Sequence, residues 1–296
     1  MSRIFDALRR SENEKAVVPT TPSGEQTRLR DLLQQMEARP AGFDQVPRIV
    51  CRTPVEEPIV TGHDDHGLGG EKFRALCHRL RQVRQSRVLS KLLITSAVPK
   101  EGKTFIALNL AVTWATSPAR VVLVDTDMRQ SGLSRALGLP LLPGLADYLE
   151  ERIPLEQAFR LVEPFGLYYV PAGSPTANPV NLLQKPLLAE FLTQAAAAFD
   201  WVVVDSPPLM PVADAQCLAG LCDGTLLVVR PGCTPRDGLE QALRALQGSF
   251  TVGIVLNGSG DAYRDHYYYY YAPSNGRNGR RRGSAPAPQP PQEPGA

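Results

Sequence analysis

The sequence predicts an α/β fold in which helices cover both faces of a mostly parallel sheet. Short apolar runs alternate with helical patterns from about residue 71 to residue 260, and this alternation is typical of parallel α/β proteins. The apolar runs lack the polar alternation of half-exposed strands, so we expect both faces of the sheet to be covered. Ligands of such sheets bind at the carboxyl ends of the strands.

Strands and helices are expected in alternation along this region. The expected strands are Lys91–Ser96, Val121–Asp125, Leu167–Val170, Trp201–Asp205, Thr225–Val229 and Val252–Leu256. The expected helices span residues 103–116, 132–138, 144–151, 185–199, 211–221 and 236–246. Two helix starts are marked by a capping residue before a proline, Asn178 before Pro179 and Thr234 before Pro235, because proline suits the first helical position.

A further helix is expected before the first strand, because apolar residues recur there at helical spacing. They are Phe73, Leu76, Cys77, Leu80 and Val83. The opposite faces are basic, but no aromatic residues accompany them as a platform for stacking bases. We therefore expect a helix that packs on the core and has a solvated charged face, and no nucleic-acid partner.

Composition divides the chain of 296 residues into five parts. The net charge of +2 excludes a strongly polycationic protein. No segment is apolar enough to span a bilayer or to act as a secretory signal. Five cysteines without a CxxC pair indicate reduced thiols in a cytosolic protein and no zinc site. The expected parts are a docking helix (1–12), a flexible linker (13–66), the folded domain (67–260), a tyrosine cluster (261–272) and a disordered basic, proline-rich tail (273–296).

The strongest chemical signal is the segment AVPKEGKT at residues 97–104. It follows a strand and opens a helix, which is the context that a phosphate-binding loop (P-loop) requires. Backbone N–H groups of such a loop point at phosphate oxygens. Lys103 can reach the β- and γ-phosphates, and the Thr104 hydroxyl can ligate Mg²⁺. We therefore expect ATP and Mg²⁺ as ligands, with a nucleotide-binding segment made of Pro99, Lys100, Glu101, Gly102, Lys103, Thr104 and Phe105.

Aspartates follow two of the expected buried strands. Asp125 and Asp127 end the run VVLVDTD, and Asp205 ends the run WVVVD. The carboxyl ends of parallel strands meet at the same edge of a sheet, so we expect these carboxylates to lie beside the P-loop. Carboxylates suit Mg²⁺ held directly or through its waters.

These motifs together resemble known families. GKT, VDTDMR and VVVDSPP are similar to motifs A, A′ and B of the deviant Walker P-loop ATPases. Positioning ATPases of this group carry an additional lysine at the position of Val98. The segments 171–183, 223–234 and 253–258 and the tyrosine run 263–271 instead resemble the bacterial tyrosine autokinases of capsule and exopolysaccharide synthesis. Residues 1–12 resemble the start of kinase subunits in exosortase-linked polysaccharide clusters.

The resemblance implies an ATP-dependent protein-tyrosine kinase that phosphorylates itself. The implied acceptors are Tyr263, Tyr267, Tyr268, Tyr269, Tyr270 and Tyr271. The implied catalytic residues are Lys103, Asp125, Asp127 and Asp205, with Asp127 as the base and Thr104, Asp125 and Asp205 on the metal. The roles of Asp125 and Asp127 are open to exchange.

The resemblance also implies partners and a location. Self-association into a ring is implied, together with a separate membrane-embedded activator of the chain-length type. The kinase would then lie in the cytoplasm, at the inner face of the membrane.

Two departures from the family leave alternatives open. Lys100 stands where the family has glycine, and a positive φ there would cost a lysine about 1 kcal/mol. The segment Glu71–Arg74 matches the start of the family's ring-forming helix, but Cys77 and Arg79 do not. One alternative is a nucleotide-switched positioning or assembly ATPase without kinase activity, and another is a non-catalytic regulatory subunit. The tyrosine run favours the kinase.

Overall fold

The computed structural model describes residues 46–52, 59–60, 68–210 and 213–259. The expected docking helix, most of the expected linker, the tyrosine cluster and the tail lie outside the described residues.

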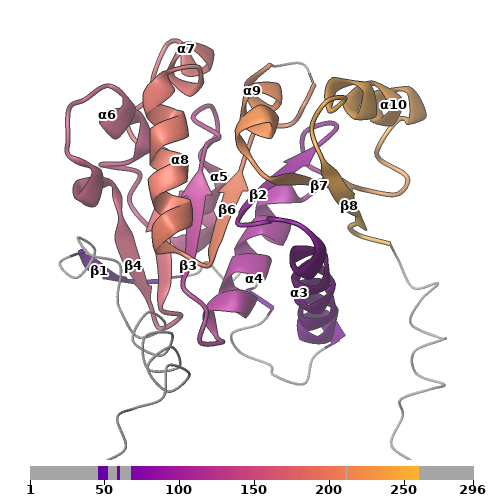
Figure 1. Cartoon of the computed structure of the whole chain (residues 1–296), viewed down its shortest axis with the longest axis horizontal. Helices are drawn as coiled ribbons and strands as arrows, with labels where there is room; N and C mark the ends of the chain where they lie inside the picture. The colour runs from indigo at the N-terminus through magenta and orange to yellow at the C-terminus, as the bar shows by residue number, and fades with distance from the viewer. Residues whose placement is uncertain (1–45, 53–58, 61–67, 211–212, 260–296) are drawn as a thin grey trace, which may run out of the picture. The chain divides into compact units, whose positions relative to one another are not determined.

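The described residues form an eight-stranded sheet in the order β1-β4-β5-β3-β6-β2-β7-β8 (Figure 1). All neighbouring strands are parallel except β4 and β5, which are antiparallel. The mostly parallel α/β fold is therefore confirmed. The strands are β1 (Arg48–Val50), β2 (Lys91–Ser96), β3 (Val121–Asp125), β4 (Arg160–Glu163), β5 (Leu167–Val170), β6 (Trp201–Asp205), β7 (Gly224–Val229) and β8 (Thr251–Leu256).

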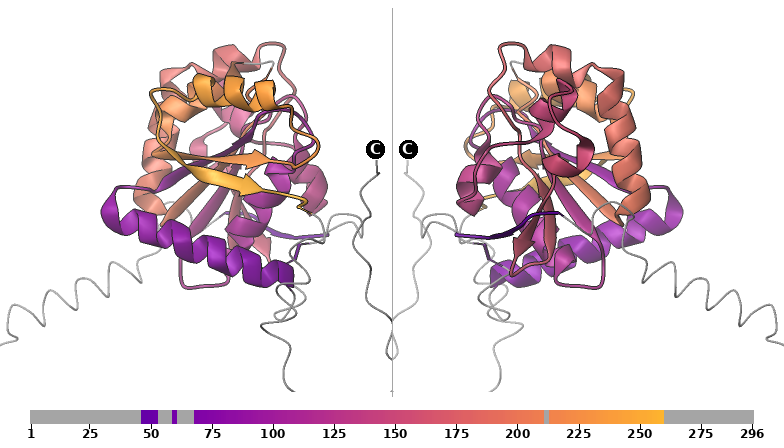
Figure 2. Two further views of the ribbon diagram at one scale, coloured as in Figure 1. Left: turned by 90° about the vertical axis from the view of Figure 1, so that its right-hand side faces the viewer. Right: turned by 90° about the vertical axis from the view of Figure 1, so that its left-hand side faces the viewer.

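Helices cover both faces of this sheet (Figures 1 and 2). One face packs against α3 (Leu68–Ser86), α4 (Lys103–Ala115) and α5 (Gly132–Leu137). The other face packs against α6 (Leu145–Leu149), α7 (Pro179–Leu183), α8 (Pro186–Ala198), α9 (Asp214–Leu221) and α10 (Arg236–Ala245). A short 3₁₀ helix, η1 (Leu155–Ala158), precedes β4.

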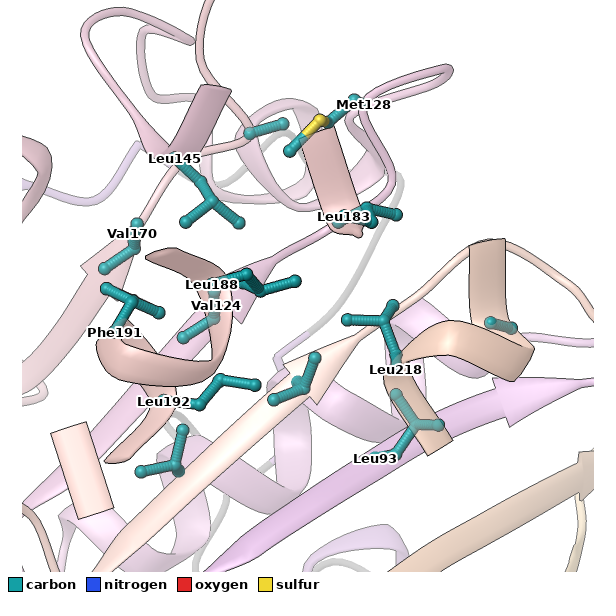
Figure 3. Packing of buried hydrophobic residues seen from close by; sticks show 14 of the residues in the cluster. Leu93, Val124, Met128, Leu145, Val170, Leu183, Leu188, Phe191, Leu192 and Leu218 are labelled. Atoms are coloured by element: carbon teal, nitrogen blue, oxygen red, sulfur yellow. The ribbon is translucent and has the colours of Figure 1, made fainter. Parts of the chain in front are cut away.

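Successive residues of the central strands belong to opposite faces of the sheet. Leu93 and Val124 pack beneath Leu188 and Phe191 of α8 and Leu218 of α9 (Figure 3). Their neighbours in the strands, among them Leu92, Ile94 and Leu123, face α3, α4 and α5. Burial on both faces explains why these strands read as continuous apolar runs rather than as alternating ones.

The expectation of a flexible linker over residues 13–66 is wrong where the structure describes that range. Residues 48–50 form the edge strand β1, which pairs in parallel with β4. Val46 and Ile59 are buried, and the backbone N–H of Val60 donates to Asn109 Oδ1 at 2.8 Å. β1 forms because it pairs with β4, which is distant in the sequence, so the composition of residues 13–66 alone does not predict it.

Several helix boundaries also differ from expectation. The helix expected over 185–199 is confirmed as α8, and the helix start expected at Pro179 belongs to a separate short helix, α7. Asn178 does precede α7, but its side chain makes no capping hydrogen bond. Thr234 does not cap α10, which begins after Pro235. The Thr234 hydroxyl instead donates to the carboxylate of Glu101, which lies in the P-loop.

Asp147 ties α6 to the segment that follows β5. One of its carboxylate oxygens accepts hydrogen bonds from the backbone N–H groups of Gly144 and Ser174. The other accepts from the Ser174 hydroxyl and from Arg152 at 2.6 Å. Burial alone would raise the pKa of Asp147, but these four donors lower it to about 2. The ionised carboxylate therefore stabilises the folded state.

Asp147→Asn is expected to lower the free energy of unfolding by about 2 kcal/mol at pH 7, because an amide cannot accept from all four donors. The pKa of Asp147 falls from its usual 3.8 to about 2 on folding. The difference between wild type and variant should therefore be complete above pH 4 and disappear as the pH falls toward 2. Urea denaturation without nucleotide measures this, with the exposed Asp237→Asn as the control. Equal midpoints at pH 7 would contradict the assigned role.

Candidate active site

Sheet pairing brings the two aspartate-bearing strand ends together beside the strand that precedes the P-loop. Asp125 of β3 pairs in register with Asp205 of β6, and Asp205 pairs with Ile94 of β2. Neighbouring strands lie about 4.8 Å apart, so the two carboxylates start from adjacent positions on one edge. The Thr126 hydroxyl donates to the carbonyl of Asp205 at 2.6 Å and holds the segment after β3 against β6.

The P-loop connects β2 to α4 through two residues with positive φ. Lys100 has φ 66° and Gly102 has φ 91°. A side chain on Gly102 would meet Asn257 Nδ2 at 2.1 Å, so only glycine fits there. Lys100 occupies a left-handed conformation at a cost of about 1 kcal/mol. The loop ends at Lys103, the first residue of α4, whose N-terminal N–H groups have no partners within the helix.

Lys103 lies among the three aspartates. Its Nζ is 3.3 Å from Asp127 Oδ2 and 3.5 Å from the Thr104 hydroxyl. Burial would lower the pKa of Lys103, but the negative charges of Asp205 and Asp127 outweigh burial and raise it. The ammonium group therefore stays charged and is held at the P-loop.

Asp125 and Asp205 are fully buried and have oxygens without partners. Asp125 Oδ1 accepts a hydrogen bond from the backbone N–H of Asp127 at 3.0 Å. Within the described residues, Asp125 Oδ2 and both carboxylate oxygens of Asp205 have no hydrogen-bonding partner of good geometry. Burial raises the pKa of Asp205 to about 6 against the opposing charge of Lys103, and burial together with Asp205 raises that of Asp125 well above its usual value.

Unpartnered buried carboxylate oxygens fit a divalent cation, because a bound cation would compensate the charge that burial disfavours. No group of three or more histidine, cysteine, aspartate or glutamate side chains in the described ranges is arranged to hold a metal by itself. A site of two carboxylates and a hydroxyl suits Mg²⁺, which usually keeps waters and substrate phosphate oxygens in its shell.

Asp127 differs from Asp125 in its partners. Its Oδ1 accepts from the backbone N–H of Gln130 at 3.1 Å, and its Oδ2 faces Lys103. Arg129, two residues further on, forms an ion pair with the buried Asp214 at the start of α9, at 2.9 Å. The segment after β3 is thereby connected both to the P-loop and to the segment after β6.

Comparison with known proteins places the chain in a family. No family model matches the chain. The tyrosine-protein kinase YwqD of Bacillus subtilis is 32% identical over 206 residues, which are 69% of this chain and 87% of YwqD. The chain belongs to the bacterial tyrosine-protein kinases. It is accordingly an enzyme that phosphorylates protein tyrosines, as the resemblance of its motifs implies.

Two further matches show how much of other relatives this kinase covers. The succinoglycan biosynthesis transport protein ExoP of Rhizobium meliloti is 34% identical over 186 residues, which are 61% of this kinase but only 23% of ExoP. The kinase domain of the Escherichia coli tyrosine kinase ETK superposes with a TM-score of 0.67 at 27% identity, covering 71% of this kinase and 83% of that domain.

The structure brings most of the predicted site residues of the kinase together, but some of their side chains face elsewhere. Pro99 has no N–H group to offer. The Phe105 ring packs edge-on against Phe73 of α3 at 5.8 Å, and the carboxylate of Glu101 is buried behind the loop. Only the backbone of these residues is placed to contact a nucleotide. The tyrosine cluster of the kinase lies outside the described residues.

Sequence reasoning missed the residues of the kinase that support the P-loop from behind. The side-chain amide of Asn257 donates to the carbonyl of Glu101 at 2.9 Å. Arg230 Nη1 donates to the carbonyl of Lys100 at 3.3 Å, and Thr234 donates to the Glu101 carboxylate. These residues fall inside family-like segments, but their types alone do not indicate this role.

Two further observations concern partners of the kinase. Glu71 and Arg74, which motivated the expectation of a ring, form an ion pair with each other on α3 at 2.7 Å. Among the described helices none is long and apolar enough to cross a bilayer.

Proposed function

We propose that this kinase transfers the γ-phosphoryl group of ATP to its own tyrosines, Tyr263, Tyr267, Tyr268, Tyr269, Tyr270 and Tyr271, and thereby regulates exopolysaccharide or capsule synthesis. The observation that carries the proposal is the contact between Lys103 and Asp127 beside two buried carboxylates with unpartnered oxygens. The name of ExoP supports the link to polysaccharide. Six of the nine tyrosines lie within residues 263–271, where several acceptors are available close together.

The residues of the site take distinct roles in this proposal. Lys103 and the N-terminus of α4 bind the β- and γ-phosphates and stabilise their charge. Thr104, Asp125 and Asp205 hold Mg²⁺, which neutralises charge on the phosphoryl group when bound. Asp125 fits the metal better than Asp127, since Asp125 has the unpartnered oxygen whereas Asp127 contacts Lys103 and Gln130.

Asp127 accepts the proton of the incoming tyrosine. A bond forms between the tyrosine oxygen and the γ-phosphorus, the bond from that phosphorus to the β-phosphate oxygen breaks, and ADP leaves. A tyrosine has an ordinary pKa of about 10, so a carboxylate helps only as the proton departs during transfer. Positioning of the two substrates supplies most of the rate.

Autophosphorylation changes charge enough to act as a switch. Each phosphotyrosine adds about −1.5 to −2 charge, so six add about −9 to −12 to a chain of net charge +2. In a ring of copies, this repulsion would drive the subunits apart. A membrane-embedded activator at the cytoplasmic face completes the proposal, because the resemblance implies one and ExoP is named as a transport protein.

Changing all six clustered tyrosines to phenylalanine tests the choice of acceptors. We expect the variant to lose at least about 90% of the phosphate that the wild type incorporates from labelled ATP, because its active site is intact but its acceptors are gone. Its affinity for Mg·ATP should not change. Tyr148→Phe/Tyr168→Phe, with both residues inside the described fold, is the matched control and should label normally. Full labelling of the six-fold variant would overturn this assignment.

A further inference from the structure

The P-loop contains a buried carboxylate that faces away from the phosphate side. Glu101 is 1% exposed. One of its carboxylate oxygens accepts a hydrogen bond from the backbone N–H of Val98 at 2.8 Å, which closes the loop across three residues. The other oxygen accepts from the hydroxyl of Thr234. A buried charge of this kind is tolerated only where donors satisfy it.

Thr234 belongs to a different part of the fold. It lies between β7 and α10, and its oxygen accepts the backbone N–H of Arg230 at 3.0 Å. A hydroxyl has one proton to donate. Two acceptors lie within its reach, the Glu101 carboxylate and the carbonyl of Arg230 at 3.2 Å, and the carboxylate is the stronger acceptor. Thr234 therefore connects the turn after β7 to the middle of the P-loop.

The hydrogen bond from Thr234 to Glu101 stabilises the P-loop at a point where its backbone is strained. Lys100 and Gly102, on either side of Glu101, both have positive φ. A non-glycine residue holds such a conformation only where its surroundings impose it. Arg230 and Asn257 donate to the carbonyls of Lys100 and Glu101. These three contacts engage only carbonyl and carboxylate oxygens of Lys100 and Glu101, so none of them occupies a loop N–H group that phosphate would need.

We propose that Thr234 is a positioning residue for ATP, which acts by holding Glu101 so that the P-loop keeps its phosphate-binding shape before nucleotide arrives. It touches no reacting atom. The proposal rests on ATP binding by this loop as argued above. Without the hydroxyl, the Glu101 carboxylate loses a charge-assisted hydrogen bond and the loop can leave its strained conformation. Nucleotide would then have to restore that conformation on binding.

Thr234→Val removes the hydroxyl and keeps the shape of the side chain, whereas Thr234→Ser keeps the hydroxyl. Calorimetric titration of the full chain with Mg·ATP should show a Kd about tenfold higher for Thr234→Val, in line with the loss of a hydrogen bond to a charged group. Thr234→Ser should stay within about twofold of wild type. In autophosphorylation assays, the KM for ATP should rise while kcat changes little.

The controls separate positioning from loss of fold. Thr193→Val makes the same chemical change on α8, where the hydroxyl bonds only within its own helix, and should leave the Kd unchanged. Thermal unfolding without nucleotide reports whether each variant folds. If Thr234→Val does not fold, Glu101→Gln provides the test and should raise the Kd similarly, because an amide cannot accept from both donors.

Three results would overturn the proposal. One is a wild-type Kd in Thr234→Val, or in Glu101→Gln where that variant provides the test. Another is a Thr234→Ser variant as weak as Thr234→Val, which would point to the methyl group rather than the hydroxyl. A wild-type chain that binds no Mg·ATP would refute the proposed function and, with it, this inference, whereas the first two results would leave the proposed function intact.

Discussion

Lys103→Met is expected to abolish phosphotyrosine formation, with a loss of at least about a thousandfold. Lys103 is the lysine of the GKT motif, and its Nζ lies 3.3 Å from Asp127 Oδ2, at the edge of the sheet where Asp125 and Asp205 also lie. Methionine keeps most of the length of the side chain but removes its charge. The γ-phosphate then loses its main protein cation, and the three aspartates lose the countercharge between them and the nucleotide. Labelling of the purified chain with Mg·ATP measures the effect.

Lys185→Met is the matched control for this change. Lys185 donates to the carbonyl of Leu149 between α6 and α8, away from the P-loop, so its loss should leave labelling within about twofold of wild type. Thermal unfolding without nucleotide should show that Lys103→Met is folded. Undiminished phosphotyrosine in folded Lys103→Met would remove Lys103 from the active site.

Asp205→Asn is expected to reduce kinase activity by about a thousandfold while making the nucleotide-free protein more stable near neutral pH. Asp205 and Asp125 are buried partners in register on adjacent strands, and neither oxygen of Asp205 has a good partner among the described residues. Two adjacent buried carboxylates favour metal binding but disfavour the empty fold. Asp205→Asn replaces one of the two carboxylates with a neutral amide. The variant therefore loses the repulsion within the pair and also the affinity of the pair for Mg²⁺.

The raised pKa of Asp205 determines how the stability difference between Asp205→Asn and wild type changes with pH. Burial raises the pKa of Asp205 from its usual 3.8 to about 6. A folded-state pKa above the unfolded one means that the contribution of Asp205 to stability is greatest below pH 4 and falls as the pH rises through 6. Asp205→Asn does not titrate, so its melting temperature relative to wild type should increase between pH 4 and pH 6 in the absence of Mg²⁺. Calorimetric melting at several pH values measures this. A variant that melts below wild type at pH 7, or that labels normally, would contradict it.

The catalytic edge of the sheet was largely predictable from the sequence. β3 and β6 begin and end at the expected residues because VVLVD and WVVVD are apolar runs that end in a charge. The spacing of GKT after β2 placed Lys103 at the start of α4. The sequence raised a positive φ at position 100 only as a condition, and the structure has Lys100 at φ 66°. These features are local, so a local pattern identifies them.

Features that depend on distant pairing were not predictable in this way. β1 is three residues long and forms only because β4 offers it a partner more than a hundred residues away. β4 begins and ends in charged residues and was missed for that reason. The sequence predicts that Thr234 caps a helix, because it precedes a proline. In the structure, its hydroxyl instead donates to Glu101 of the P-loop, a residue distant in the sequence. Nothing within a few residues of Thr234 indicates that the partner is Glu101.

Mapping of phosphosites tests most directly whether this kinase transfers phosphate from ATP bound at its P-loop to its own tyrosine cluster. The wild-type chain is incubated with Mg·ATP, with the activator's cytoplasmic segment added if one is known, and is then analysed by mass spectrometry. We predict phosphate on Tyr263 or on Tyr267–Tyr271. Consumption of ATP with all six tyrosines bare would contradict the claim and indicate a nucleotide-switched assembly ATPase instead.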